Sequence, residues 1–127
     1  MEPLPRPTDA ELEILTVLWS LGPSTVRDVY EELLKRKDAQ YTTVLKFMQI
    51  MTEKKILRRD EAQRAHIYRP AFSREATQRQ LAGDLLQRAF GGSAKELLIG
   101  ALGAKKSTRQ ELAEMRRLLD EYEKGKR

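Results

Sequence analysis

Side chains that donate hydrogen bonds to phosphate oxygens and to base edges recur along one stretch of this sequence. Helical spacing would place four of them on one face, with an isoleucine beside them: Thr42, Thr43, Lys46, Gln49 and Ile50. Threonine, lysine and glutamine make such contacts in nucleic-acid complexes. An ordinary solvated helix has a similar composition, so the neighbouring segments have to decide between the two interpretations.

A helix that offers this polar face must bury the opposite one, and residues 41–54 are expected to do so. Val44, Met48 and Met51 recur at the spacing of a buried stripe on the other side of this predicted helix. The sequence therefore predicts an amphipathic helix with one apolar side and one polar side.

Two further helices are predicted before it. The first, about Asp9–Leu21, has Thr8 at the N-cap position and is ended by a glycine–proline pair. The second begins after Thr25, which has Asp28 three positions further on, and carries apolar residues at i, i+3, i+4, i+7 and i+8.

Two short basic strands are predicted after the polar helix. They are Ile56–Asp60 and Ala65–Pro70, joined by a polar turn at Glu61–Arg64. Residues 41–70 carry seven basic and three acidic side chains, whereas residues 1–40 carry five and eight. Three helices and a basic hairpin in this order predict a winged helix-turn-helix domain. In that architecture the third helix enters the major groove of DNA and the hairpin lies along the backbone.

The pattern changes to helices alone near residues 70–73, so we expect one domain over residues 1–71 and a helical domain over residues 72–127. The predicted fold class is mainly α with a small β-hairpin wing. Lobes of this size without disulfides or metals rarely bury apolar stripes alone, so association of two copies is the economical arrangement. The alternative is that the three C-terminal helices fold back over the first helix of the chain and form a monomeric core with it. The predicted dimerisation residues are Leu81, Leu85, Leu86, Phe90, Leu97, Leu98, Leu102, Leu112, Met115, Leu119 and Tyr122.

Composition excludes several kinds of chemistry. The 127 residues include no cysteine and one histidine, so disulfide frameworks, thiolate nucleophiles and two-histidine metal sites are excluded. His66 lies in a predicted strand without an obvious nucleophile, and no glycine loop has phosphate-cradling spacing, so neither an enzyme nor a cofactor is expected. No signal peptide or membrane span is indicated, and we expect a cytoplasmic protein.

Several separated blocks of the sequence resemble one known family. They are Pro7–Leu15, Thr25–Val29, Tyr41–Val44, Arg64–Tyr68, Phe90–Ser93 and Glu111–Glu114. In this order they resemble the penicillinase-repressor (BlaI/MecI/CopY) family of bacterial transcription factors over nearly the whole chain. The resemblance implies an N-terminal winged-helix domain, a C-terminal dimerisation domain, and repression by a homodimer bound to a palindromic DNA operator.

The resemblance assigns base reading to the helix of residues 41–54, and the hairpin of about 56–70 supplies further cations. The predicted DNA-binding residues are Tyr41, Thr42, Thr43, Lys46, Gln49, Ile50, Lys54, Arg58, Arg59, Arg64 and His66. Ile50 departs from the family, in which a basic residue is frequent at this position. An apolar side chain contacts a thymine methyl but pairs with neither guanine nor phosphate, so a different operator sequence is expected.

The family also suggests how DNA would be released. Some relatives are inactivated by a cut in the dimerisation domain when a membrane sensor detects a β-lactam, which makes a regulatory protease a candidate partner. The Asn-Phe bond cut in those relatives would fall near Gly100–Ala101 and is missing here. Copper-responsive relatives use a C-terminal cysteine cluster, so metal sensing of that kind is excluded.

Two other functions are compatible with a winged helix. A helical protein-interaction adaptor would bind an acidic protein partner without sequence-specific DNA binding. An architectural DNA binder would bind without a preferred site, although a formal net charge of +5 is modest for sequence-independent wrapping. The concentration of basic residues between positions 41 and 70 favours sequence-specific DNA binding over both.

Overall fold

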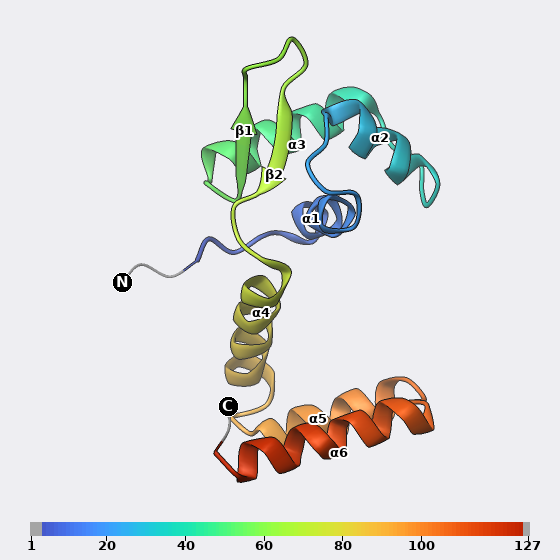
Figure 1. Cartoon of the computed structure of the whole chain (residues 1–127), viewed down its shortest axis with the longest axis vertical. Coiled ribbons are helices and arrows are strands. Elements are labelled where there is room, and N and C mark those ends of the chain that lie inside the picture. The colour runs from blue at the N-terminus through green and yellow to red at the C-terminus, as the bar shows by residue number, and fades with distance from the viewer. Residues whose placement is uncertain (1–3, 126–127) are drawn as a thin grey trace. The chain divides into compact units, whose positions relative to one another are not determined.

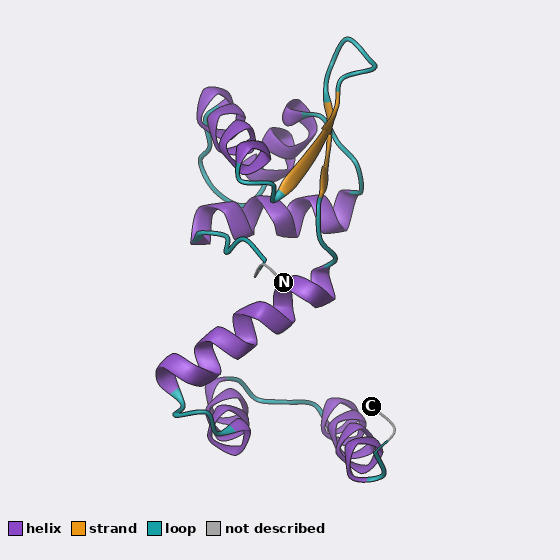
Figure 2. Ribbon diagram, turned by 90° about the vertical axis from the view of Figure 1, so that its left-hand side faces the viewer, coloured by secondary structure: helices purple, strands orange, loops and turns teal. Residues whose placement is uncertain are grey.

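The computed structural model describes residues 4–125, and within them it contains six helices and one antiparallel hairpin (Figures 1 and 2). Their bounds are α1 Asp9–Leu21, α2 Val26–Leu34, α3 Tyr41–Glu53, β1 Leu57–Asp60, β2 Ile67–Pro70, α4 Arg74–Ala89, α5 Ala94–Ala104 and α6 Arg109–Glu123. The predicted class, mainly helical with a hairpin wing after the third helix, is confirmed.

The first two helices begin with reciprocal capping boxes. The Thr8 side chain accepts a hydrogen bond from the N–H of Glu11, and the Glu11 carboxylate accepts one from the N–H of Thr8. Thr25 and Asp28 form the same pair of bonds at the start of α2. Each box satisfies N–H groups that have no partner inside the helix, which is why both helices start where the sequence predicts.

One apolar core joins α1, α2, α3 and the hairpin. The predicted inner stripe of α3 is confirmed, because Val44, Met48 and Met51 are all buried. The buried residues of this core are Ile14, Leu15, Val17, Leu18, Val26, Val29, Leu33, Val44, Met48, Met51, Ile56, Leu57 and Tyr68. All of them lie before residue 70, so the described core belongs to the N-terminal part of the chain.

The hairpin is fixed to the helices by its backbone as well as by side chains. Arg58 lies opposite Arg69, and Arg59 opposite Tyr68, in the antiparallel register. Tyr68 also exchanges two backbone hydrogen bonds with Ser24, at 2.8 and 3.0 Å, in the loop between α1 and α2. This bridge gives the two-stranded hairpin a third backbone partner, which helps to hold an element that is marginal alone.

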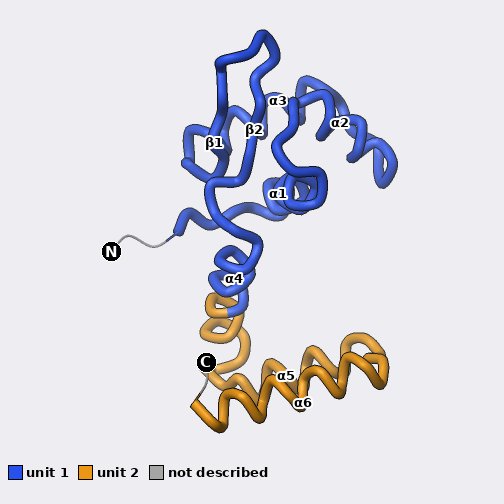
Figure 3. The backbone as a smooth tube through the Cα atoms, in the orientation of Figure 1, with its two compact units in different colours: residues 1–82 blue, residues 83–127 orange. Residues whose placement is uncertain are grey.

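The chain divides into two compact units, residues 1–82 and residues 83–127 (Figure 3). The division falls inside α4, later than the change in sequence pattern near residues 70–73. The first turns of α4 group with the N-terminal unit because they pack on it. The Trp19 indole N–H donates to the carbonyl of Phe72 at 3.4 Å, the Arg74 guanidinium lies 5.9 Å from the Trp19 ring centroid, and Thr77 is buried.

The last two helices are capped but not buried. Ser93 and Thr108 accept hydrogen bonds from the backbone N–H groups of Glu96 and Glu111. Within the described part of the chain, α5 and α6 contain no buried residue and do not pack extensively on each other or on α4. Local capping therefore accounts for where these helices begin, while their apolar side chains lack a core.

The end of α1 supplies a test of the backbone argument. Gly22 has φ +87° and ψ −172°, a conformation that is nearly restricted to glycine. We expect Gly22→Ala to lower the free energy of unfolding by about 1–3 kcal/mol, measured by urea titration with circular dichroism.

The matched control is Gly83→Ala, at a helical glycine of α4 with open space around an added Cβ. Alanine has the higher helix propensity, so this variant should lose no stability. Equal stability of Gly22→Ala and the wild-type protein would contradict the strain assigned to Gly22.

Candidate nucleic-acid interface

The outer face of α3 is a polar surface opposite the buried stripe. Thr42, Thr43, Lys46 and Gln49 are exposed, whereas Ile50 is half-buried. All but Gln49 line one surface hollow of about 490 Å³, together with the half-buried ring of Phe47. The structure thus brings four of the five predicted residues of this helix face together around one depression, and leaves Gln49 exposed on the same helix.

The two faces of the hairpin have different roles. Leu57 and Tyr68 are buried, so one face belongs to the core. Arg58 and Arg69 are exposed and lie directly opposite each other across the strands. Like charges in that position repel, and an anion near them would relieve the repulsion. These two arginines make the outer face of the hairpin positive.

Arg59 is more engaged within the protein than Arg58. Its guanidinium lies 3.5 Å from the Glu61 carboxylate, and its hydrogen bond to Tyr68 raises the pKa of Arg59 above the ordinary value. Glu61 also has its Oε1 atom 3.8 Å from Nε2 of His66. Two of the predicted DNA-binding residues of the wing therefore share one acidic neighbour at the turn.

Arg64 and His66 come together with Tyr41 at a second hollow, of about 370 Å³, between the start of α3 and the outer end of the hairpin. Arg27, at the start of α2, also lines it. The sequence pattern did not single out Arg27. A usable signal was its place in the first turn of a helix, where a cation opposes the helix dipole.

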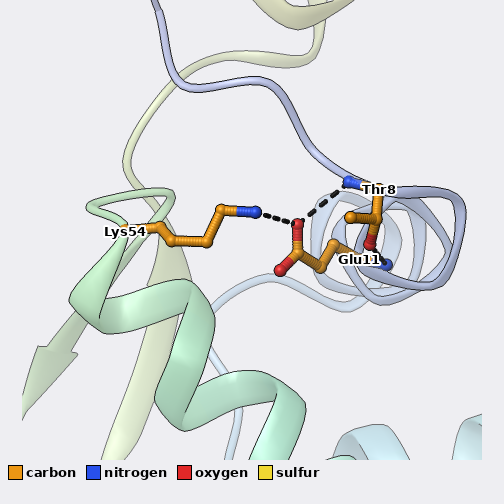
Figure 4. Close-up of polar contacts among 3 residues, drawn as sticks. All are labelled: Thr8, Glu11 and Lys54. Atoms are coloured by element: carbon orange, nitrogen blue, oxygen red, sulfur yellow. Dashed lines mark hydrogen bonds and ion pairs between the residues drawn. The ribbon is translucent and has the colours of Figure 1, made fainter.

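Lys54 is held by a carboxylate inside the domain (Figure 4). Its Nζ atom lies 2.7 Å from Oε1 of Glu11, and the same oxygen accepts the N–H of Thr8 at 2.9 Å. Glu11 is only 2% exposed. Burial alone raises the pKa of Glu11, but the hydrogen bonds from Lys54 and Thr8 outweigh it, so the pKa lies below the ordinary 4.5.

This ion pair joins the start of α1 to the end of α3. The sequence groups Lys54 with the DNA-binding residues, whereas the structure directs its ammonium group toward Glu11. Neither Glu11 nor Lys54 lines either of the two hollows. Lys54 therefore positions the last turn of α3 against α1, separately from the exposed polar face.

The predicted dimerisation residues are all half-buried or exposed. Half-buried are Leu81, Leu86, Phe90, Leu97, Leu98, Leu112 and Met115, and exposed are Leu85, Leu102, Leu119 and Tyr122. Tyr122 and Leu119 are 57% and 54% exposed, and Ile99, which the sequence pattern did not select, is 58% exposed. Ile99 was missed because its neighbours Leu97 and Leu98 fit the stripe better.

Two other kinds of site are absent from the described residues. Between residues 4 and 125, no group of three or more histidine, aspartate or glutamate side chains could hold a metal ion. Over the same range, no helix combines the length and the apolar character that crossing a membrane requires. The polar α3 face and the hairpin are the surfaces on which the functional argument rests.

Known proteins resemble this chain over most of its length. The family model described as penicillinase repressor matches residues 7–121. Over 130 aligned residues, the chain is 34% identical to the transcriptional regulator BlaI of Mycobacterium tuberculosis, covering 98% of this chain and 91% of that relative. It is 22% identical to the penicillinase repressor of Bacillus licheniformis, over all of this chain and 99% of the relative.

A solved structure shares part of this fold. It is the solution structure of monomeric Bacillus licheniformis BlaI in complex with the blaP half-operator, with a TM-score of 0.52 and 25% sequence identity. The match covers 60% of this chain and 93% of the solved chain.

The buried pair supplies a prediction about pH. Because the pKa of Glu11 is lower in the folded protein, its contribution to stability is present above about pH 4.5 and is lost as the pH falls through the folded pKa. Glu11→Gln, which has no carboxylate to titrate, should flatten this part of the pH dependence in urea titrations between pH 3 and 7.

Lys54→Ala should lower the free energy of unfolding at pH 7 by about 1–3 kcal/mol, because it leaves Glu11 buried without its counter-ion. Lys46→Ala, at an exposed lysine of α3, is the control and should change the free energy of unfolding little.

The pH prediction has its own contradicting outcome. Identical pH curves for the wild-type protein and Glu11→Gln would show that the ion pair does not couple to folding.

Proposed function

The chain belongs to the penicillinase repressor family of transcriptional regulators, and from this premise we propose that two copies bind a palindromic operator together and repress transcription. In this proposal α3 enters the major groove of each half-site, and the hairpin follows the adjacent backbone. The two copies of α3 would lie about one helical turn of DNA, roughly 34 Å, apart.

One observation carries the proposal. The same helix that buries Val44, Met48 and Met51 exposes hydroxyl, amide and ammonium groups on its other side, next to a hairpin with exposed arginines. Hydroxyl and amide groups read base edges, whereas the arginines of the hairpin match the phosphates in charge. The likeness to a BlaI chain in complex with a half-operator supports this use of the surface.

Association of two copies is supported by the C-terminal helices. Ile99, Leu119 and Tyr122 are each more than half exposed in the single chain, and α5 and α6 contain no buried residue. Exposed apolar side chains in this number are typical of a surface that meets a partner. A second copy of the chain would cover them and would also match the two-fold symmetry of a palindrome.

The mechanism requires binding and no catalysis. Occupation of the operator excludes transcription at the promoter, so the protein changes no covalent bond and uses no cofactor. We place this activity in the cytoplasm. Release by a regulatory protease stays a prediction from the family, and the corresponding positions Gly100 and Ala101 are exposed within α5.

Gel shifts of the DNA upstream of its own gene, at rising salt, test the proposal. The protein should prefer that duplex over a scrambled one. Arg58→Ala should weaken binding to all sequences and reduce the salt slope by about one unit if Arg58 binds one phosphate, whereas Gln49→Ala should change the sequence preference. Absence of any preference at every salt concentration would end the proposal of a specific repressor.

Light scattering tests the association of two copies. Leu112→Glu combined with Leu119→Glu places carboxylates in the apolar stripe of α6, and should yield monomers that bind the operator more weakly. Glu114→Gln, on the same helix, is the control and should stay dimeric. If the double variant stays dimeric, the interface would instead be assigned to Leu85, Leu86 and Leu97.

A further inference from the structure

The second hollow brings Arg27, which the sequence pattern did not assign to DNA binding, together with residues that it did. It lies between the first turn of α2, the first turn of α3 and the outer end of the hairpin, and measures about 370 Å³. Arg27, Arg64 and His66 all line it. Side chains that are cationic or can be protonated thus reach one depression from two separate elements, α2 and the hairpin, beside the start of α3.

Arg27 is held in a defined direction there. Its guanidinium carbon lies 5.3 Å from the centroid of the Tyr41 ring. That ring is itself fixed by an edge-on contact with Tyr30, at 5.7 Å between centroids and 84° between planes. Tyr30 packs against the core, so the stack runs from the core to the surface. A guanidinium on an aromatic face is positioned without being neutralised.

Asp28 and Glu61 are the acidic neighbours, and neither lines the hollow. Asp28, next to Arg27, accepts the backbone N–H of Thr25 at 3.0 Å in the capping box. Glu61 lies near His66 at 3.8 Å and near Arg59 at 3.5 Å, on the hairpin. The first turn of α2 adds the positive end of its helix dipole on the side of Arg27. The side chains that line the hollow therefore carry an excess of positive charge.

We infer that this hollow binds a backbone phosphate of the operator and that Arg27 is a DNA-contacting residue. The inference rests on the proposed function and adds a third element, the start of α2, to the surface formed by α3 and the hairpin. A guanidinium fork matches two phosphate oxygens at once, which favours a phosphodiester over a base edge at this site. The phosphate clamp, defined as Arg27, Arg64 and His66, fixes the start of α3 along the groove.

The full-length variant Arg27→Ala tests the clamp. On the duplex from its own upstream region, binding at 0.1 M salt should weaken roughly eightfold if Arg27 neutralises one phosphate. One phosphate contributes about 0.9 to the slope of log affinity against log salt, which over the tenfold range between 1 M and 0.1 M is a factor of about eight. The weakening should be similar for the operator and for scrambled DNA, since a phosphate carries no sequence information.

Arg36→Ala is the matched control, because it removes the same charge from an exposed position just beyond the other end of α2. It should keep the wild-type salt slope. If the unfolding midpoint of Arg27→Ala falls, Arg27→Gln replaces it, because that side chain keeps a stem over Tyr41 without the charge.

Neutral methylphosphonate linkages, introduced one at a time into the duplex, locate the bound phosphate. At one position per half-site, the neutral linkage should weaken the wild-type protein but not Arg27→Ala. At every other phosphate that the protein binds, the neutral linkage should weaken both proteins equally.

The outcomes separate the clamp from the proposed function. If the wild-type protein prefers its operator while Arg27→Ala binds as tightly as Arg36→Ala, the clamp is overturned and the repressor proposal stands. The clamp is also overturned if no linkage distinguishes the wild-type protein from Arg27→Ala. If the wild-type protein shows no operator preference, the proposed function itself fails.

Discussion

The rotational setting of α3 is the constraint on which the rest of this structure depends. One helix has to supply three buried residues to the core and, on its other side, a row of groups free to meet DNA. Val44, Met48 and Met51 fix the rotation, because turning the helix by one residue would expose methionine and bury a threonine or a glutamine. The Glu11–Lys54 pair then fixes the end of the helix against α1.

The division of charged side chains follows from that constraint. Lys54 forms an ion pair with Glu11 inside the domain, and Arg59 interacts with both Tyr68 and Glu61. Arg58 and Arg69 face outward across the hairpin, where no core residue competes for them. Some of the basic side chains therefore also stabilise the fold that presents the others.

Local physics made much of this fold predictable from the sequence. Capping residues, the glycine–proline pair and the apolar periodicity act over a few residues, so α1 was expected over Asp9–Leu21 and is found there. The inner stripe of α3 was predictable for the same reason. Exposure of the polar α3 residues also followed, whereas their contacts with DNA stay predictions.

Long-range pairings were not predictable in this way. In the sequence, Glu11 is explained by its position alone, because a negative charge is favourable in the first turn of a helix. No neighbouring residue indicates that Lys54 is its partner. Arg27 resembles any solvated side chain until α2 and α3 bring it over Tyr41. In the sequence, the start of α4 looks like part of a new domain, but the hydrogen bond from Trp19 to the carbonyl of Phe72 holds the chain just before α4 against the N-terminal unit. Each case depends on a partner that only the tertiary structure supplies.

The two units of the chain have different relations to stability, and this difference bears on regulation. The N-terminal unit contains its own core, so the surface proposed to face DNA is formed in a single chain. The C-terminal helices α5 and α6 contain no fully buried residue, so in the proposed dimer their stability is linked to the concentration of the second copy. Joining two DNA-binding units makes the second binding event intramolecular and strengthens modest contacts. In the proposed dimer, a signal that separates the C-terminal helices would therefore release the DNA without altering any of the residues proposed to contact it.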